Sequence, residues 1–558
     1  MSETLTPTTD PPRDPKPQAL DEASSQACGA GATVYLETFG CQMNVLDSQL
    51  VTGQLKALGY RLIDDWRAAD VVLYNTCSVR EMAENKVWSR VGIVGKHKQE
   101  QADAGKLPGV LGVIGCMAER DGTDLLKKHP QVDLMCGPGE LDRVPMLVDN
   151  ALKTRLIDPS PTRARGDVQV ALQGNTHRRS ATLSAASDQL ELVDLSRAFA
   201  AEDTSANGRS AYVRITRGCN KQCTYCVVPN TRGAEVHRPP DHIVRECQKL
   251  EAAGVREITL LGQTVNHYHY DTAATVTVDG VQQPQVGATI SPNAGNGGPS
   301  PTFSPTTVSF AKLLRRIHDE CPGVLRLRFV TSLPRDFGDD ILETIADCPR
   351  LCRYLHLPVQ SGSDRVLRKM NRGYKAADYF DLIERARRIL PDCEIATDLI
   401  CGFPGETEED HALTKDLLRR CRFKNAFIFK YSPRPGTIAY DRLADDISDD
   451  IKKRRNHELL TIQSEISAEV HAAYVGRTVE VFVESVSAKA TKAANGAAPG
   501  SPDVSLGWQS PRTTTQLTGR TGGDLIVMFD GDPKLIGEMA QVKIASATPL
   551  ALFGALVE

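Results

Sequence analysis

The sequence has few aromatic residues, no excess of basic charge and no long apolar run, and each absence excludes a class of protein. Aromatic residues make up 5% of the 558 residues, and the formal net charge is −4. Any nucleic acid must therefore be bound by local basic patches, because the chain has no overall positive field. No run reaches the roughly 18 apolar residues of a membrane span, so we expect no contact with a membrane.

Disulfide-rich and exported proteins are also excluded by composition. The 15 cysteines are too sparse for a disulfide scaffold, which is short and far denser in cysteine. Residues 1–32 are rich in Pro, Thr, Ser and acidic residues, and they lack the features of a signal or transit peptide. We expect these residues to form a disordered tail, and the whole chain to be a cytoplasmic enzyme with metal-bound and buried thiols.

The most informative motif is a C-x3-C-x2-C run formed by Cys219, Cys223 and Cys226. Three thiolates on one short loop suit three corners of a [4Fe–4S] cluster, since soft sulfur ligands favour iron–sulfur centres. No fourth cysteine is close by, which leaves one iron open, as in radical S-adenosylmethionine (SAM) enzymes. A zinc site is the alternative, but zinc usually takes four ligands in two pairs. The spacing therefore favours the cluster.

Three further cysteines end apolar strand patterns in residues 33–157. The predicted strands cover 34–38, 71–77 and 110–116, and they lead to Cys41, Cys77 and Cys116, with a helix from about residue 47. Alternating strands and helices predict a small α/β domain with a parallel sheet, whose ligand sites gather at the carboxyl ends of the strands. A single cysteine of this kind is usually a buried structural thiol. The repeated placement favours a second three-ligand cluster.

Residues 158–209 have the composition of a linker, because they are rich in Ser, Ala, Arg and Gln and lack a sustained period. Four arginines make this stretch basic: Arg163, Arg165, Arg178 and Arg179. They either contact RNA or belong to a solvated flexible face, and the second interpretation is favoured.

Residues 210–445 form the predicted central domain. Six short apolar strands alternate with helical patterns, at 212–215, 257–261, 325–330, 354–357, 394–400 and 426–430. This number predicts a partial (β/α)6 barrel. The segment 271–307 is rich in Gly, Pro, Thr, Asn and Gln, so we expect a disordered surface insertion.

The last part of the chain changes character. A connecting helix is expected at 446–474, followed by a small β-barrel at 475–558 with strands near 479–483, 515–521, 525–529 and 539–544. A second low-complexity insertion, at 488–507, interrupts this barrel.

These residues together resemble the methylthiotransferase family of the radical SAM superfamily over nearly all of the folded chain. The motifs that carry the resemblance are 40–44 (GCQMN), 75–80 (NTCSVR), 115–118 (GCMA), 217–229, 231–233, 261–263, 356–363, 402–407 and 431–437. Gln42-Met43-Asn44 favours the branch that methylthiolates N6-isopentenyladenosine in tRNA. Relatives that act on a ribosomal-protein aspartate or on threonylcarbamoyladenosine stay open as alternatives. Thr264, His237 and Leu333 depart from the Asn, Ser and His that we expect.

The resemblance implies a function for each cysteine set. Cys219, Cys223 and Cys226 would bind the [4Fe–4S] cluster that cleaves SAM, and Cys41, Cys77 and Cys116 an auxiliary [4Fe–4S] cluster that carries the sulfur. The radical from SAM would remove hydrogen from carbon 2 of an adenine next to the anticodon, because general-base chemistry cannot break such a C–H bond. A second SAM would supply the methyl group.

The resemblance also suggests contacts to SAM. Gln263 follows the second strand of the central domain, and Ser332, Gln360 and Asp398 lie at or near the ends of later strands. Each of these could equally be a polar residue that satisfies the backbone of a loop.

The expected partner is the anticodon loop of tRNA, whose bases are already splayed out of the helix. The C-terminal barrel resembles a TRAM domain, an RNA-binding module. Its candidate phosphate contacts are Arg477, Arg512 and Arg520, for each of which a solvated surface arginine is the alternative. A reductant such as flavodoxin or ferredoxin and a source of sulfur are also expected, and the chain itself is expected to be a monomer.

Overall fold

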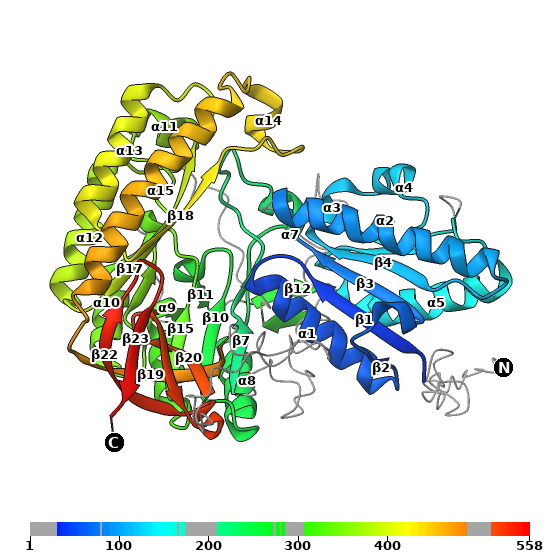
Figure 1. Ribbon diagram of the computed structural model, residues 1–558, viewed down its shortest axis with the longest axis horizontal. Coiled ribbons are helices and arrows are strands. Elements are labelled where there is room, and N and C mark those ends of the chain that lie inside the picture. Colours follow the sequence, from blue (N-terminus) through cyan, green and yellow to red (C-terminus); the bar gives the residue numbers. More distant parts are fainter. Residues whose placement is uncertain are drawn as a thin grey trace, which may run out of the picture.

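The computed structural model describes residues 31–78, 81–163, 167–172, 209–271, 275–278, 281–284, 306–487 and 515–557. They form an N-terminal α/β domain, a central partial barrel and a small closed β-barrel, as shown in Figure 1. The predicted α/β fold class is confirmed. Within these ranges, no helix is both long and apolar enough to cross a lipid bilayer.

The N-terminal domain contains one six-stranded sheet in the order β2-β1-β3-β4-β5-β6, with every pair parallel. Its strands are β1 (Thr33–Thr38), β2 (Arg61–Leu62), β3 (Val71–Thr76), β4 (Val110–Gly115), β5 (Leu134–Cys136) and β6 (Gln169–Ala171). Its helices are α1 (Gln42–Ala57), η2 (Trp66–Ala68), α2 (Glu81–Asp103), α3 (Cys116–Asp121), α4 (Asp124–Lys128), η3 (Leu141–Arg143) and α5 (Val144–Ile157). Strands β3 and β4 are buried along their whole length, as continuous apolar strands covered on both faces are.

Two predictions for this domain are wrong in detail. Helix α1 begins at Gln42 rather than near residue 47, because the Asn44 side chain accepts a hydrogen bond from the Cys41 amide and caps the first turn. Strand β6 lies inside the predicted linker and completes the sheet. Arg163 is also buried there, 3.1 Å from Asp133, and is no part of a solvated face. Arg165, Arg178 and Arg179 lie outside the described residues.

The central domain has two three-stranded parallel sheets, β15-β10-β7 and β16-β17-β18, joined by a parallel bridge between Leu327 and Leu351. The strands are β7 (Ser210–Arg214), β10 (Glu257–Leu261), β15 (Arg326–Phe329), β16 (Tyr354–His356), β17 (Glu394–Cys401) and β18 (Asn425–Lys430). The outer helices are α8 (Pro240–Ala252), α9 (Phe310–Glu320), α10 (Asp339–Asp347), α11 (Asp364–Lys369), α12 (Ala376–Ile389), α13 (Glu408–Cys421) and α15 (Asp449–Ala472). The largest apolar core of the chain lies between these helices and the strands.

Shorter elements decorate the central domain. They are β8 (Thr216–Arg217), α7 (Val228–Arg232), β9 (Val236–His237), η4 (Val265–His267), η5 (Pro334–Asp336) and α14 (Ile438–Arg442). Strands β8 and β9 form a small antiparallel ribbon on either side of the loop with Cys219, Cys223 and Cys226.

Part of the predicted disordered insertion is ordered. Strand β11 (His269–Asp271) pairs with β14 (Thr307–Ser309), and β12 (Thr275–Val278) pairs with β13 (Val281–Pro284), both antiparallel. The prediction is wrong for these strands, because β-branched residues flank Asp279-Gly280, a pair that two-residue hairpin turns prefer. Residues 285–305 lie outside the described part of the chain.

The C-terminal barrel closes in the order β19-β20-β21-β23-β22. Its elements are β19 (Thr478–Val486), β20 (Thr515–Thr521), β21 (Ile526–Gly531), η6 (Pro533–Leu535), β22 (Met539–Ala547) and β23 (Leu552–Leu556), of which the sequence analysis missed β23. Arg326 and Arg328, at the amino end of β15, donate hydrogen bonds to the carbonyl groups of Glu480 and Thr521 at 3.0 and 2.9 Å. The barrel therefore covers the amino ends of the central strands. The predicted insertion at 488–507 is not among the residues described.

Candidate functional site

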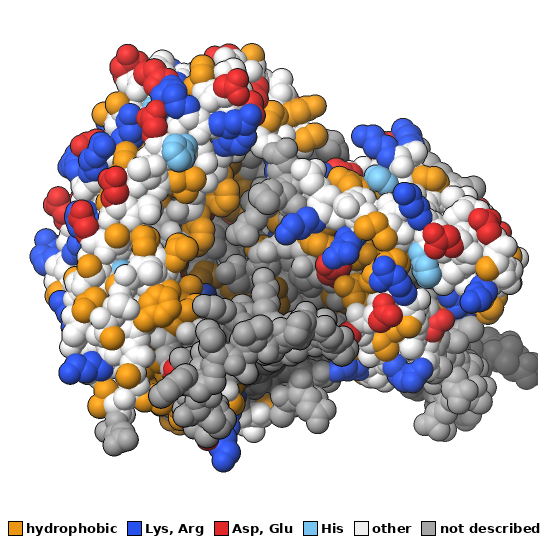
Figure 2. Space-filling view, viewed as in Figure 1, with side chains coloured by type: hydrophobic (Ala, Val, Ile, Leu, Met, Phe, Trp, Pro, Cys, Tyr) orange, Lys and Arg blue, Asp and Glu red, His pale blue; other side chains and the backbone are white. Residues whose placement is uncertain are grey.

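One cavity of about 710 Å³ brings the two cysteine sets together. Its lining includes five of the six predicted cluster ligands: Cys41, Cys77, Cys219, Cys223 and Cys226. Cys116, the sixth, is buried behind them at the start of α3. Figure 2 shows hydrophobic side chains of the central domain along the hollow beside the N-terminal domain. The cavity thus lies where the carboxyl ends of both parallel sheets meet, as expected for α/β ligand sites.

The N-terminal cysteines are positioned by a buried amide pair. The Asn44 side chain donates hydrogen bonds to Oδ1 of Asn75 at 3.0 Å and to the carbonyl of Thr76 at 3.1 Å. The Asn75 side chain donates in return to the carbonyl of Asn44 at 2.8 Å and to Oγ of Ser48 at 2.9 Å. Both asparagines are fully buried, so these bonds fix the turn after β1 against the end of β3.

Gly40 allows this close approach. Its φ of +153° lies in a region that favours glycine, and a Cβ there would be 2.4 Å from Oδ1 of Asn44 and 2.8 Å from Cβ of Cys77. Any larger residue would separate Cys41 from Cys77.

A buried ion cluster links these cysteines to the central domain. Asp47 on α1 lies 3.3 Å from Nη1 of Arg214 and 2.8 Å from Nη2 of Arg232, and all three side chains are buried. Interaction with Cys77 and the charge of Arg232 lower the pKa of the Cys41 thiol to about 5, although burial opposes this change. Burial raises the pKa of Cys116, against the opposing effect of Arg232. Arg232 therefore faces both thiols and favours their ionised forms.

The central cysteine loop is held from outside by a segment distant in sequence. Arg372 donates to Sγ of Cys223 at 3.4 Å, to Oη of Tyr225 at 3.3 Å and to the carbonyl of Pro358 at 2.7 Å. Asn371 donates to the carbonyl of Gln222 at 2.8 Å. A buried guanidinium beside the sulfur also offsets negative charge on the thiolates.

The start of this loop requires Gly218. Its φ is +65°, and a Cβ at this position would lie 2.1 Å from the carbonyl oxygen of Ala234, a backbone atom. Burial raises the pKa of Cys219, and it raises the pKa of Cys226 to about 12. Without a metal these two thiols are therefore neutral, and positive iron is needed to stabilise their thiolates.

The four predicted SAM contacts all line the cavity. Oε1 of Gln263 and Oγ of Ser332 are buried, and neither has a hydrogen-bond partner among the residues that the structure describes. Asp398 pairs with Nε2 of His356 at 3.0 Å, and the amide of Gln360 donates to the carbonyl of Asp398 at 2.8 Å. Two buried polar atoms without partners inside a cavity are what a polar ligand would satisfy.

Two residues of the cavity wall have a strained backbone. Thr331 has a φ of +71° and Gln360 a φ of +76°, which side chains other than glycine rarely adopt. Each lies directly after or near the end of a central strand, beside the predicted SAM contacts. Such strain persists where the surrounding structure fixes it, and it concentrates at functional sites.

The donor groups fit the implied cofactors. Two sets of three thiols suit two [4Fe–4S] clusters with one open iron each, and the unsatisfied atoms of Gln263 and Ser332 suit the polar groups of SAM.

The three arginines that were predicted to contact phosphate do not lie together on one surface of the described chain. Arg520 lines the cavity, and its side chain pairs within the C-terminal barrel with Asp524 at 2.9 Å and Glu484 at 3.2 Å. Its carbonyl accepts a hydrogen bond from Arg326 of the central domain. Arg477 is exposed and lies over the ring of Tyr474. Arg512 lies outside the described residues.

Two aromatic residues of the site were missed by the sequence analysis. Phe427 and Phe429 on β18 line the cavity and are 42% and 40% exposed, while Ala426 and Ile428, which alternate with them, are buried. The alternation was visible in the sequence, since successive residues of a strand point to opposite faces. The roles of Asn75 and Arg372 were missed as well, because their partners are distant in sequence.

Comparison with known proteins identifies the family. Residues 213–418 match the Radical SAM superfamily, and residues 33–137 match the uncharacterized protein family UPF0004. The chain is 39% identical over 522 residues to the tRNA-2-methylthio-N(6)-dimethylallyladenosine synthase of Rhodopirellula baltica, a match that covers 94% of this chain and 95% of that protein. Proteins of the same name from Bacteroides thetaiotaomicron and Opitutus terrae are 36% and 35% identical over 93% and 94% of this chain and 95% and 97% of their own length. The predicted resemblance is confirmed, and the chain belongs to the tRNA-2-methylthio-N(6)-dimethylallyladenosine synthase family of radical SAM enzymes.

Proposed function

We propose that this chain attaches a methylthio group to carbon 2 of N6-isopentenyladenosine next to the anticodon of tRNA. The observation that carries the proposal is that both cysteine sets lie at one cavity. The reaction needs a radical that attacks an unactivated C–H bond and a sulfur atom held close to that carbon. Two cofactor sites at one cavity meet both needs. The names of the relatives support the same substrate.

We assign each cofactor to one set of cysteines. Cys219, Cys223 and Cys226 hold the [4Fe–4S] cluster that binds SAM, and Cys41, Cys77 and Cys116 hold the auxiliary [4Fe–4S] cluster. When bound, these cofactors supply the reductive cleavage of SAM and the sulfur, and a second SAM supplies the methyl group. The protein orients the reactants and keeps water away from them.

The residues at the strand ends position SAM. Oε1 of Gln263 and Oγ of Ser332, which have no partner within the described ranges, would accept hydrogen bonds from the ammonium group of SAM. The Asp398 carboxylate, fixed by His356, offers an acceptor to ribose hydroxyl groups. Gln360 shapes the wall through its fixed backbone. Each hydrogen bond to a charged group of the ligand contributes about 1.5–3 kcal/mol.

The adenine is held by stacking. A modified base must leave its own stack to reach the radical, and exposed aromatic rings give it a new surface. Phe427 and Phe429 present such rings at the cavity. The C-terminal barrel, which resembles a TRAM domain, would hold the RNA backbone, with Arg477 as an exposed candidate contact.

Loss of one ring should weaken binding of the substrate. We expect Phe427→Ala or Phe429→Ala to cost about 1–3 kcal/mol, as stacking on a single base does. The KM for tRNA would rise by about fivefold to a hundredfold, while uncoupled cleavage of SAM continues. Steady-state kinetics with isopentenylated tRNA measures this change, and Phe380→Ala, away from the cavity lining, is the control. An unchanged KM would remove the rings from the substrate site.

The remaining partners follow from the chemistry. A reductant such as flavodoxin or ferredoxin supplies electrons, and an external source restores the sulfur that each turnover consumes. We propose that the chain acts as a monomer in the cytoplasm.

The decisive experiment is an anaerobic assay with reconstituted protein, SAM, a reductant and tRNA that contains isopentenyladenosine. We expect nucleoside mass spectrometry to find the methylthio product, and Cys41→Ala or Cys219→Ala to abolish it. Cys393→Ser, at a half-buried cysteine away from the cavity, should keep full activity. Formation of 5′-deoxyadenosine with unmodified tRNA, together with a methylthiolated ribosomal protein, would overturn the choice of substrate.

A further inference from the structure

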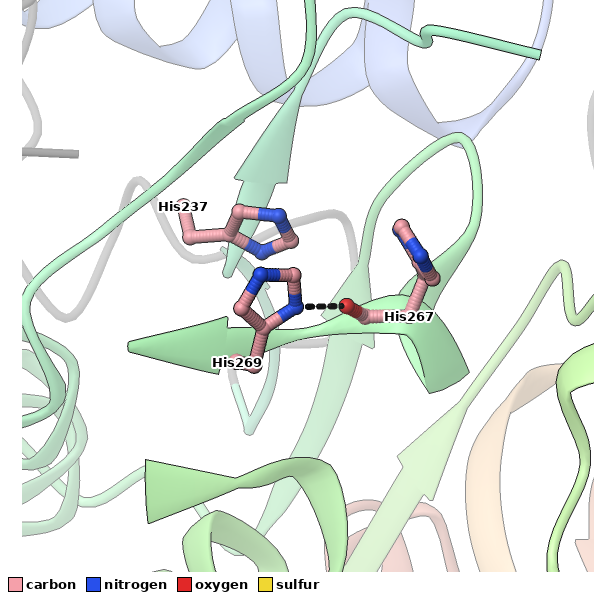
Figure 3. Close-up of side chains that lie close together, drawn as sticks. All are labelled: His237, His267 and His269. Carbon is pink, nitrogen blue, oxygen red and sulfur yellow. Dashed lines mark hydrogen bonds between the residues drawn. The ribbon is translucent and has the colours of Figure 1, made fainter. Parts of the chain in front are cut away.

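A cluster of three histidines lies outside the cavity described above. His237 ends β9, His267 ends η4 and His269 begins β11. One ring nitrogen from each histidine lies within 4.8 Å of the corresponding nitrogens of the other two. Figure 3 shows the rings of His237 and His269 close together, with His267 on the adjoining turn. None of the three lines the cavity of the cysteine sets. We propose that these histidines bind a divalent transition-metal ion such as Zn²⁺.

Hydrogen bonds prepare two of the rings for this role. Nδ1 of His267 lies 2.9 Å from Oε1 of Glu235, and Nδ1 of His269 lies 2.9 Å from the carbonyl oxygen of His267. Each bond makes Nδ1 the donor and leaves a lone pair on Nε2. A carboxylate or carbonyl behind the ring is the usual second-shell partner of a histidine that binds a metal.

His237 supplies the third ligand. Its side chain is fully buried, and neither ring nitrogen has a hydrogen-bond partner within the described chain. Leaving a buried polar atom without a partner costs about 1–3 kcal/mol, and a bound metal would remove that cost for one nitrogen. Burial also lowers the pKa of His237 to about 3, so the ring is neutral, as ligation requires.

The geometry needs only a small adjustment to bind a metal. Zinc–nitrogen bonds of about 2.0–2.1 Å place tetrahedral ligand nitrogens roughly 3.3 Å apart. The rings, whose nitrogens lie within 4.8 Å, therefore have to approach by at most roughly 1.5 Å. The fourth position is left for water, because Oε1 of Glu235 is engaged by Nδ1 of His267.

The position of the site indicates a structural function. Glu235 donates its backbone amide to Oδ1 of Asn220 at 3.0 Å, and Asn220 follows Cys219 directly. The segment before η4 contains Gln263 and Thr264 of the cavity wall. A metal on the three histidines would therefore tie the cysteine loop to the strand end that carries Gln263.

Zinc titration of the protein with both clusters reconstituted tests the proposal, and no tRNA is needed. We expect about one Zn²⁺ per chain to remain after gel filtration, with a zinc X-ray absorption spectrum of nitrogen and oxygen ligands at about 2.0–2.1 Å. His237→Ser and His269→Gln should each weaken binding at least about tenfold, the scale of a lost outer-shell partner. His457→Ser, at an exposed histidine of α15, should bind as the unmodified chain does.

Three results would overturn the assignment. They are no zinc retained by the unmodified chain, zinc with sulfur ligands at about 2.3 Å, or a zinc affinity of His237→Ser and His269→Gln that equals that of the unmodified chain. The spectrum of the unmodified chain decides the question even if a variant fails to fold. The result is also independent of the proposed function, because methylthiolation of tRNA can fail while zinc still binds to the histidines.

Discussion

The two cysteine sets hold equal numbers of thiols but are assembled in different ways. Cys41, Cys77 and Cys116 come from three separate strand ends, and only the parallel sheet brings them together. Cys219 to Cys226 lie in one loop, which residues 369–372 hold in place from outside. The first site thus depends on the fold of a whole domain, whereas the second depends on a local backbone path and one external brace.

The electrostatic environments of the two sets differ as well. Cys77 and Arg232 lower the pKa of Cys41 to about 5, while burial raises the pKa of Cys226 to about 12. Before any iron binds, Cys41 is therefore a thiolate at neutral pH, whereas Cys226 is a neutral thiol. At Cys41 the interaction with Cys77 and the charge of Arg232 outweigh burial, whereas at Cys226 burial outweighs the opposing charge of Arg372.

The largest expected effect is the loss of one cluster while the other is kept. Gly218→Ala should remove the central cluster and leave the N-terminal one, because the new Cβ would lie 2.1 Å from the Ala234 carbonyl. Iron would fall from about eight to about four atoms per chain, and formation of 5′-deoxyadenosine would stop. Iron analysis and electron paramagnetic resonance measure both changes.

The control for that variant is Gly254→Ala. Gly254 also has a positive φ, +92°, but a Cβ there meets nothing within 4 Å. It should lose only about 1 kcal/mol of stability and keep both clusters. If Gly218→Ala keeps its full iron content, the central loop is not fixed by this backbone contact.

A smaller effect is expected when the hydrogen bonds that support each cysteine set are removed. Asn75→Ala should lower the free energy of unfolding by about 1–3 kcal/mol, because it removes three buried hydrogen bonds with Asn44 and Ser48. Asn371→Gly removes one exposed bond to Gln222, and glycine tolerates the φ of +57° found there, so its cost should be below about 1 kcal/mol. Urea unfolding of the cluster-free variants measures both values. Equal costs would show that the two sites are supported alike.

The smallest effect concerns thiol reactivity in the cluster-free protein. Cys41 has a lowered pKa, so its thiolate predominates above about pH 5, and it should be alkylated at least about tenfold faster than Cys226 at pH 7. Arg232→Met removes the positive charge, raises the pKa of Cys41 and should slow its alkylation near pH 6. Peptide mass spectrometry after a short iodoacetamide pulse gives the rates.

Arg67→Met, at an arginine stacked on Trp66 away from the cavity, is the matched control for the charge change. A pH profile of Cys41 that is the same in all three proteins would contradict the assigned influence of Arg232.

Much of the site could be predicted from the sequence because it follows local rules. The spacing of the central cysteines and the polar residues after apolar strands, such as Gln263 and Asp398, mark strand ends that the structure places at one cavity. The pairing of β12 with β13 could have been predicted in the same way from the Asp-Gly pair in the sequence between them, but the low-complexity composition of the segment favoured a prediction of disorder.

Other parts could not be predicted, since they depend on pairs of residues far apart in sequence. The Asn44–Asn75 amide pair and the contact of Arg372 with Cys223 need the folded sheets before their partners are known. The positive φ of Thr331 is likewise imposed by its surroundings, because threonine does not prefer that conformation.

The buried Asp47 has a consequence for the modularity of the enzyme. It is the shared counter-ion of Arg214 and Arg232, so one carboxylate of the N-terminal domain pairs with two buried arginines of the central domain. A chimera that exchanges the N-terminal domain and omits this carboxylate would remove the acid that both guanidinium groups share, at a cost of about 3–5 kcal/mol. Such an exchange has to transplant the acid together with the thiols, which makes the domain boundary in the sequence a poor guide to where this protein can be cut.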